Sequence, residues 1–288
     1  MMRVDLPDGR RLDVEVEGPE GGLPLVYHHG APGAAVLYRP LVDAAARHGL
    51  RIVTYARPGY GRSDAAPGRV VADAARDTAA VLDALGLGDF VTVGWSGGGP
   101  HALACATVLA GRCMAAATLG GVAPYTAEGL DWTAGMGADN IEEFGAAVSG
   151  EPALTEYLRA QEEVLGRVTG AEVADALGDL VSEVDRRQLT GGFADYLAES
   201  FRIAVTAGIA GWRDDDLAFI RKWGFDLRGG CPVAVWQGDQ DRMVPYAHGR
   251  WLAANVPGAR AHLLPGHGHL SLFGLVDEVL DDLVAGRA

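Results

Sequence analysis

Basic side chains, cysteines and long apolar runs are all scarce in this chain of 288 residues. It has 24 Lys and Arg against 38 Asp and Glu, and the formal net charge of -14 argues against nucleic acid or an anionic membrane as a partner. No uninterrupted apolar stretch is long enough to cross a bilayer, and residues 1–5 lack the apolar segment of a secretory signal. We therefore expect a cytoplasmic protein that acts on a small molecule, with an oligomeric state that the sequence does not decide.

The three cysteines, Cys105, Cys113 and Cys231, are odd in number and fall on apolar segments. This favours buried thiols in a reducing compartment over a disulfide scaffold. Their spacing does not match a zinc site. We expect no bound metal and no organic cofactor.

Apolar runs typical of strands alternate with helical periodicity over most of the chain. The runs lie at 10–17, 24–28, 50–56, 88–93, 231–237 and 259–264, and helical periodicity appears between them, as at 71–85. Such alternation predicts an α/β fold with a mostly parallel twisted sheet and helices on both faces.

Strand signals vanish between residues 124 and 225. Two capping-box patterns, at 139–142 and 169–172, and apolar helix faces over 154–165 and 193–205 take their place. We interpret 124–225 as an all-helical segment, called the cap below, inserted into a core made of 1–123 and 226–288.

A serine stands in a glycine-rich turn at the end of a predicted strand. Ser96 lies in G-W-S-G-G over 94–98, after the apolar run 88–93 and before a small, apolar stretch that can form a helix over 97–110. In this strand-to-helix context a G-x-S-x-G turn lifts the hydroxyl clear of its neighbours, as a nucleophile requires. The N–H of Gly97 would face that hydroxyl from a helix N-terminus and could stabilise an oxyanion.

A second motif, H-G-A-P-G over 29–33, follows the apolar run 24–28. Together the two motifs resemble α/β-hydrolase fold enzymes of the His-Gly-x-Pro-Gly type. The resemblance implies that the N–H of Ala31 is the other oxyanion donor, and Pro32 has no N–H to offer. It also implies that the cap follows the sixth strand of the sheet.

A third match, R-P-G-Y-G-R-S over 57–63, resembles a structural loop of the same family. Family members commonly have Asp just before the Arg, and here that position is Ala56. Any hydrogen bond made by that carboxylate is therefore missing or replaced in this chain.

In this family an acid and then a histidine follow the serine along the chain. The resemblance selects Asp241, shortly before Val244, and His269, in a Gly-His-apolar signature after the last predicted strand. Asp239 and His267 lie two residues away from these, and spacing alone leaves each choice open. We interpret Asp239 as a turn residue that binds nearby backbone amides.

The cap carries a large share of the aromatic residues. Most should form its core, since aromatic residues at helical spacing usually do. A few should face Ser96 and line an apolar cavity for the acyl part of an organic compound. Candidates for this lining are Trp95 of the elbow with Trp132, Tyr157 and Trp212 of the cap.

Acidic clusters of the cap lie at 142–143, 162–163 and 214–216. Solvated helix faces and a helix N-terminus account for such clusters more simply than a site for a cationic substrate. We therefore expect their side chains to be solvated.

These residues predict a serine hydrolase that cleaves a carboxylic ester of a small to medium apolar organic compound. His269 would take the proton of Ser96, Asp241 would orient the imidazole, and an acyl-enzyme would form. A serine nucleophile argues against the family's haloalkane dehalogenases and epoxide hydrolases, which place Asp there.

Other activities fit the same three residues: an amide or peptide hydrolase like a proline-type aminopeptidase, a C–C bond hydrolase or a lyase. A proline-type aminopeptidase would need cap carboxylates aimed at the substrate amine, and its Gly-Gly-Ser-Trp-Gly elbow differs from the one here. A ligand receptor on a hydrolase fold could also keep the residues. The fold by itself does not decide the substrate.

Overall fold

The computed structural model describes residues 1–287 and contains one sheet of eight strands. The strands are β1 (Met2–Asp5), β2 (Arg11–Glu17), β3 (Leu23–His28), β4 (Leu50–Tyr55), β5 (Phe90–Trp95), β6 (Cys113–Leu119), β7 (Val233–Gly238) and β8 (Arg260–Leu264). Their spatial order is β1-β2-β4-β3-β5-β6-β7-β8. Strands β1 and β2 are antiparallel to their neighbours and all other pairs are parallel, so the predicted mostly parallel sheet is confirmed.

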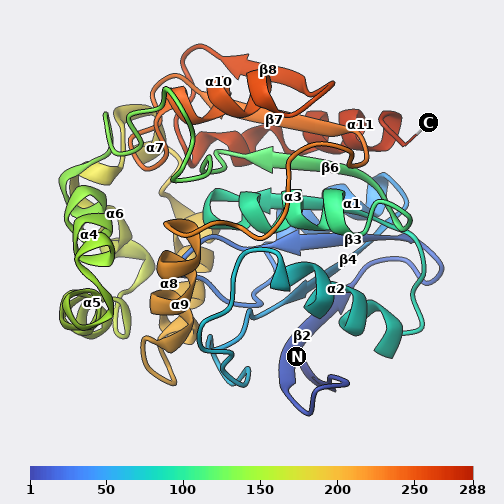
Figure 1. Cartoon of the computed structure of the whole chain (residues 1–288), viewed down its shortest axis with the longest axis horizontal. Coiled ribbons are helices and arrows are strands. Elements are labelled where there is room, and N and C mark those ends of the chain that lie inside the picture. The colour runs from blue at the N-terminus through green and yellow to red at the C-terminus, as the bar shows by residue number, and fades with distance from the viewer. Residues whose placement is uncertain (288) are drawn as a thin grey trace.

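Helices cover both faces of the sheet. They are α1 (Arg39–Arg47), α2 (Asp73–Ala84), α3 (Gly99–Val108), α4 (Ala138–Ser149), α5 (Glu151–Leu165), α6 (Val173–Ala176), α7 (Glu183–Arg186), α8 (Gly191–Ala204), α9 (Ala210–Phe219), α10 (Tyr246–Asn255) and α11 (Val276–Ala285). Helices α2 and α3 contact each other in front of the sheet in Figure 1, and α1 and α11 contact each other behind it. The buried strands between them form the core.

Between β6 and β7 the described chain forms helices α4 to α9 and no strand. These helices gather at one end of the sheet, on the left in Figure 1. Short 3-10 turns occur here as η2 (Gly170–Glu172) and η3 (Gly178–Leu180), and in the core as η1 (Ser96–Gly98) and η4 (Ser271–Leu275). The cap segment therefore lies over the ends of the strands, at the loops that follow them.

One of the two predicted capping boxes is present. Thr169 and Glu172 form it, with the backbone N of Thr169 3.0 Å from Oε2 of Glu172. The box predicted at 139–142 is wrong, because α4 begins at Ala138. The carboxylate of Asp179 accepts the N–H of Ala138 at 3.0 Å, so a distant acid replaces the local cap.

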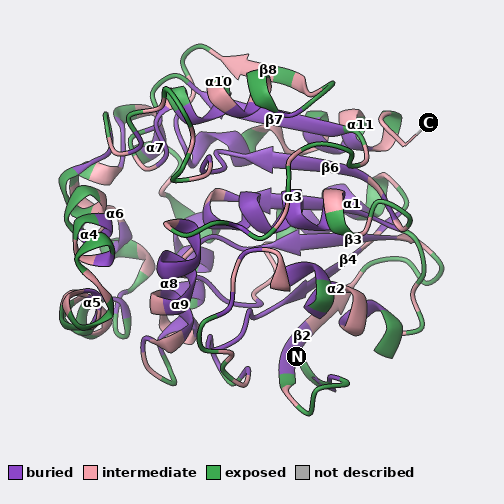
Figure 2. Cartoon of the chain, in the orientation of Figure 1, coloured by how far each residue is buried: buried purple, intermediate pink, exposed green. Residues whose placement is uncertain are grey.

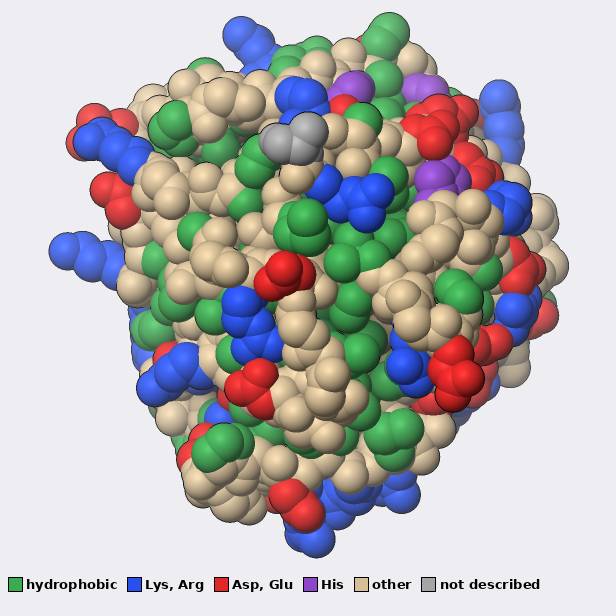
Figure 3. Space-filling view, turned by 90° about the vertical axis from the view of Figure 1, so that its right-hand side faces the viewer, with side chains coloured by type: hydrophobic (Ala, Val, Ile, Leu, Met, Phe, Trp, Pro, Cys, Tyr) green, Lys and Arg blue, Asp and Glu red, His purple; other side chains and the backbone are tan. Residues whose placement is uncertain are grey.

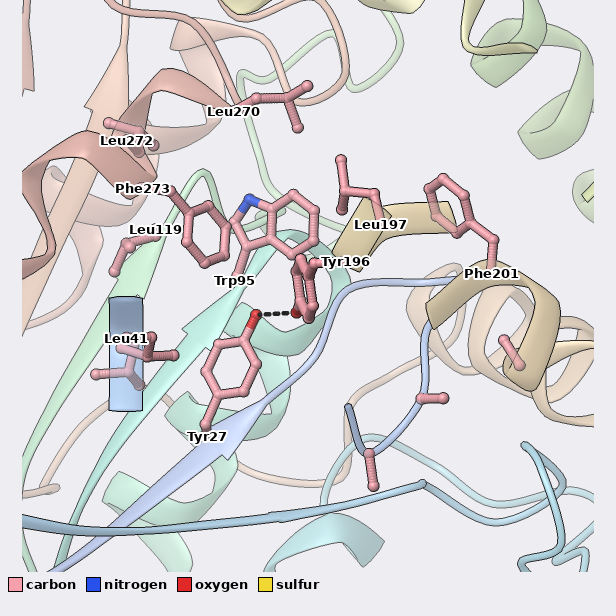
Figure 4. Packing of buried hydrophobic residues seen from close by; sticks show 14 of the residues in the cluster. Tyr27, Leu41, Trp95, Leu119, Tyr196, Leu197, Phe201, Leu270, Leu272 and Phe273 are labelled. Atoms are coloured by element: carbon pink, nitrogen blue, oxygen red, sulfur yellow. Dashed lines mark hydrogen bonds between the residues drawn. The ribbon is translucent and has the colours of Figure 1, made fainter. Parts of the chain in front are cut away.

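Helix α8 of the cap packs directly on the strands. Tyr196 of α8 meets Tyr27 of β3, with 3.4 Å between their hydroxyl oxygens (Figure 4). Trp95 lies edge-on to Phe273, with ring centroids 5.0 Å apart. Burying each such side chain stabilises the fold by about 1.5–3 kcal/mol, so cap and sheet share one hydrophobic core.

The acidic cluster of α9 is buried, so the expectation of solvated side chains is wrong there. Asp214, Asp215 and Asp216 are 4%, 0% and 1% exposed, and Figure 2 shows α9 as largely buried. Glu143 of α4 is also buried, whereas its neighbour Glu142 is exposed as expected. Sequence clustering did not reveal that α9 packs against α4 and α5 and that its Asp215 pairs with Arg57 of the core.

Acidic and basic side chains are intermingled on the face shown in Figure 3. Exposed ion pairs such as Arg47 with Asp277, 2.7 Å between Nη2 and Oδ2, contribute little to stability. None of the helices in residues 1–287 combines the length and the apolar character that crossing a membrane requires.

Candidate active site

The turn after β5 holds Ser96 in a backbone conformation that side chains rarely adopt. Its φ is 56°, and it is the sole non-glycine residue of the described chain with a positive φ. A Cβ at Gly94 would lie 2.1 Å from the carbonyl oxygen of Gly98, and one at Gly98 would lie 2.1 Å from that of His28. Only glycine allows these approaches, so the flanking glycines permit the elbow that presents Ser96.

The two predicted oxyanion residues lie together at Ser96. Gly97 follows the serine in η1, and a Cβ built on it would be 3.2 Å from the backbone N of Ala31 and 2.8 Å from its Cβ. Ala31, Ser96 and Gly97 line one small cavity. Ala31 and Gly97, from two separate loops, therefore lie against each other beside Ser96, where their backbone amides can stabilise an oxyanion.

His269 and Asp241 form a fully buried pair beyond the ends of β8 and β7. Nδ1 of His269 donates to Oδ2 of Asp241 at 2.7 Å. The other carboxylate oxygen accepts the N–H of Met243 at 2.9 Å and of Val244 at 2.8 Å. Because Nδ1 carries the proton, Nε2 of His269 is the basic nitrogen, and it has no hydrogen-bond partner among residues 1–287.

The environment of His269 stabilises its protonated form. Burial opposes the positive charge, but the charge of Asp241, the hydrogen bond to it and the charge of Asp185 raise the pKa of His269 above its ordinary value of 6.5. An imidazole of this kind accepts a proton readily near neutral pH. The pair can therefore serve as a general base for a hydroxyl placed at Nε2.

Two residues that the sequence analysis did not single out support this pair. Nε2 of Gln237, on β7, donates to Asp241 at 3.0 Å and to the carbonyl oxygen of Val244 at 2.8 Å. Gly120, just after β6, has a φ of 55°, and a Cβ there would lie 2.8 Å from Nδ1 of His269. A glycine directly after an apolar strand run was the available signal for this close approach.

A third missed residue, Asp185 of α7, comes from the cap. Its buried carboxylate accepts the N–H of His269 and of Leu270, both at 2.8 Å, and that of Ser271 at 2.9 Å. The hydroxyl of Ser182 donates to the same group at 3.0 Å. The S-x-x-D pattern at 182–185 is visible in the sequence, but the sequence does not show that the Asp185 carboxylate contacts the backbone at His269.

The loop that bears Ala31 is held by a buried ion cluster. Arg57 donates to the carbonyl oxygens of His29 at 2.6 Å and Gly30 at 2.8 Å, and its guanidinium lies 2.7 Å from Oδ2 of Asp215. Burial opposes the charge of Asp215, but Arg57 and Arg69 keep the pKa of this carboxyl well below its usual range. A cap carboxylate thus pairs with the Arg of the loop that lacks an acid at position 56.

Two cavities meet at Ser96. The larger, of about 100 Å³, is lined by Ser96, His269 and mainly apolar side chains, among them Leu197 and Phe201 of α8. The smaller, of about 40 Å³, is lined by Ser96, Ala31, Gly97 and two carboxyl-bearing residues. His269 lines only the larger cavity and Asp216 only the smaller one, whereas Glu143 lines both.

Three of the four aromatic pocket candidates line the larger cavity: Trp95, Tyr157 and Trp212. Trp132 lines neither cavity, which corrects its assignment. It packs edge-on against Phe144 with ring centroids 4.5 Å apart, and its Nε1 donates to the carbonyl oxygen of Ala123 at 2.7 Å. Trp132 therefore belongs to the packing between the cap and the core.

Asp239 and His267, which spacing alone did not separate from Asp241 and His269, take no part in the buried pair. Asp239 lies in a turn, and its Oδ1 accepts the N–H of Gly266 in the loop after β8 at 2.8 Å rather than an amide of its own turn. The carbonyl oxygen of His267 accepts the N–H of Gln240 at 2.8 Å, and its side chain does not line either cavity. Among residues 1–287 no group of three or more His, Cys, Asp or Glu side chains is arranged to hold a metal ion.

Comparison with known proteins places the chain in a family. Residues 24–274 match the family model described as alpha/beta hydrolase fold. A non-heme haloperoxidase of Rhodococcus erythropolis is 28% identical over 269 residues, 92% of each chain. A non-heme chloroperoxidase of Streptomyces lividans is 33% identical over 151 residues, 52% of this chain and 55% of the relative. The solved structure of a thermophilic esterase from Thermogutta terrifontis superposes with a TM-score of 0.68 at 18% identity, covering 100% of this chain and 99% of the other.

Proposed function

Because the chain belongs to the α/β-hydrolase fold family, we propose that it is a serine hydrolase that cleaves a carboxylic ester through an acyl-enzyme on Ser96. The observation that carries the proposal is the buried His269–Asp241 pair, 2.7 Å apart, whose free Nε2 belongs to a residue lining the same cavity as Ser96. A hydroxyl, a base and an orienting acid are the parts that acyl transfer requires.

In the first half of the reaction the Ser96 oxygen bonds to the substrate carbonyl carbon, and its proton passes to Nε2 of His269. Asp241 keeps the proton on Nδ1 and stabilises the imidazolium. The N–H groups of Ala31 and Gly97 receive the oxyanion, and each such donor contributes about 3 kcal/mol to transition-state stabilisation. When the tetrahedral intermediate collapses, the alcohol leaves with the proton from His269.

In the second half, water replaces the alcohol beside His269. The imidazole takes a proton from this water as its oxygen attacks the acyl carbon. Collapse of the second tetrahedral intermediate breaks the bond to Ser96 and returns the proton to its oxygen. The enzyme is regenerated and the carboxylic acid is released.

The comparisons support a hydrolase of this family more directly than an ester substrate. The relatives at 28% and 33% identity are named as haloperoxidases, and the likeness to esterases at under 25% identity concerns the fold. The ester assignment therefore rests on the site geometry and is open to a direct test.

The test is labelling with a fluorophosphonate probe together with hydrolysis of p-nitrophenyl acetate and butyrate. Wild-type protein should be labelled and should turn over both esters, whereas Ser96→Ala should lose labelling and hydrolysis with an unchanged thermal melting profile. Labelling of Ser96→Ala at the wild-type level would overturn the assignment. A single turnover without release, in wild type, would indicate a receptor.

The names of the relatives favour one second candidate activity. Hydrogen peroxide could replace water as the nucleophile on the acyl-enzyme, so that a peracid is released, which then oxidises a halide and returns to the carboxylic acid. Peracid formation from acetate ester and peroxide that is lost in Ser96→Ala would support it. Hydrolysis of the ester without peracid in excess peroxide would exclude it.

A further inference from the structure

The smaller cavity at Ser96 contains two carboxyl groups that ester hydrolysis does not need. Glu143 of α4 and Asp216 of α9 are 8% and 1% exposed, and both line this cavity of about 40 Å³ with Ser96; Glu143 also lines the larger cavity. Nε1 of Trp212 donates to Oε1 of Glu143 at 2.7 Å. Oδ2 of Asp216 has no hydrogen-bond partner within residues 1–287. A buried carboxylate oxygen without a partner destabilises the free protein, so it points to a missing ligand.

These two acids also have no basic partner in the described chain. Their neighbours on α9 do: Asp214 with Arg213 at 2.9 Å, and Asp215 with Arg57 and Arg69. Burial raises the pKa of both Glu143 and Asp216, and the two groups interact with each other. Burial without a basic partner disfavours the charged form of both carboxyls, and a bound cation would offset that cost.

The position of His269 decides which part of a substrate meets this charge. The alcohol must leave beside His269, which protonates it, and His269 lines only the larger cavity. The acyl part of the substrate therefore points into the smaller cavity. That cavity admits only a few atoms, so the group that meets Glu143 and Asp216 lies close to the carbonyl carbon.

We propose that the substrate carries a protonated amine on the carbon next to its carbonyl, and that Glu143 and Asp216 bind this ammonium. The inference rests on the proposed hydrolysis at Ser96. An ammonium offers three donors and a positive charge, which matches an unpartnered oxygen and two buried carboxyls without a basic partner. The acyl group is thus short and cationic rather than apolar, and the apolar larger cavity receives the alcohol.

The test compares two esters that differ only in this group: the benzyl ester of alanine and benzyl isobutyrate, in which a methyl replaces the ammonium. Benzyl alcohol release is measured at about pH 7, and each kcat/KM is divided by the rate constant for hydroxide hydrolysis of the same ester. This division removes the greater intrinsic reactivity of the amino ester. We expect the normalised ratio to favour the alanine ester by about tenfold or more, as one charge-assisted contact implies.

Two variants test the residues and one controls for nonspecific charge. Glu143→Gln keeps an acceptor for Trp212, and Asp216→Asn keeps the side-chain shape; each should lower the ratio by about tenfold while leaving labelling by fluorophosphonate intact. Glu142→Gln removes the exposed carboxylate next to Glu143, at a residue that lines neither cavity, and it should leave the ratio unchanged. In wild type, 2-aminopropan-1-ol should inhibit hydrolysis of p-nitrophenyl acetate more strongly than 2-methylpropan-1-ol.

The outcomes separate this inference from the proposed function. Suppose that the wild type is labelled by the probe and hydrolyses the acetate ester. A ratio of the normalised kcat/KM values near one for the two benzyl esters would then overturn the ammonium site alone. Equal inhibition by the two alcohols would do the same. So would a ratio that survives in folded Glu143→Gln and Asp216→Asn. Absence of labelling and of all ester turnover in wild type would overturn both.

Discussion

The buried carboxylate of Asp185, in the cap, accepts the backbone N–H of His269, in the core, at 2.8 Å. The same carboxylate accepts the next two backbone N–H groups along the chain. It therefore accepts the free backbone N–H groups at the start of η4, as an N-terminal capping side chain does, although it comes from another part of the chain. The cap segment therefore contacts the loop of His269 through a carboxylate, besides lining the larger cavity at Ser96.

We predict that Asp185→Asn lowers kcat by about tenfold or more with little change in KM. The substitution removes one accepting oxygen and the charge that helps to raise the pKa of His269, so the acid limb of the pH profile should also move to lower pH. Glu183→Gln, on the same helix but exposed, is the control. A lower melting temperature together with an unchanged acid limb of the pH–rate profile would show that Asp185 is only structural.

The pH profile of the wild type follows from the raised pKa of His269. Hydrolysis requires the neutral imidazole, so kcat/KM for p-nitrophenyl acetate should fall as the pH drops through a pKa above 6.5. In Asp241→Asn burial still opposes the positive charge and only Asp185 still favours it, so the limb should move to lower pH, and kcat should fall by about four orders of magnitude. An unchanged limb in Asp241→Asn would assign the titration to another group.

Backbone strain at Ser96 predicts a difference between two inactive variants. Glycine adopts a positive φ without the Cβ penalty, so Ser96→Gly should be more stable than Ser96→Ala by about 1 kcal/mol. Denaturant unfolding of both proteins measures this difference. Equal stabilities would mean that the turn relaxes when the serine is removed.

Asp215 should be among the most sensitive positions for stability. Asp215→Asn leaves Arg57 and Arg69 buried without their shared carboxylate, and the free energy of unfolding should fall by about 3–5 kcal/mol. Asp277→Asn breaks the exposed pair with Arg47 and should cost less than about 1 kcal/mol. Similar losses in the two variants would contradict the importance of burial here.

The wall of the larger cavity should discriminate between alcohols. Phe201→Leu should change kcat/KM for a benzyl ester severalfold while sparing the methyl ester of the same acid, because only the larger alcohol reaches α8. Trp132→Phe, at a residue outside both cavities, should leave this ratio of esters unchanged. Equal effects of Phe201→Leu on both esters would place the alcohol elsewhere.

Local pattern was sufficient for most of the sheet, though not for β1 and β6, and for the sequence neighbourhood of the candidate site. Apolar runs that alternate with helical segments predict six of the eight strands, because a strand that is buried on both faces needs a continuous apolar stretch of its own. The elbow at Ser96 is equally local, since its shape depends on glycines within two residues. Asp241 and His269 were found through resemblance to a family, because spacing alone did not separate them from Asp239 and His267.

Only the tertiary structure decided how acids of the cap are used. By sequence Glu143 and the cluster at 214–216 look like solvated surface, yet α9 buries the cluster, pairs Asp215 with two arginines and leaves Asp216 facing the cavity at Ser96. Asp185 likewise acts on His269, 84 residues away. A carboxylate has the same local pattern whether water, an arginine or a backbone amide surrounds it, so its role depends on which distant segment folds against it.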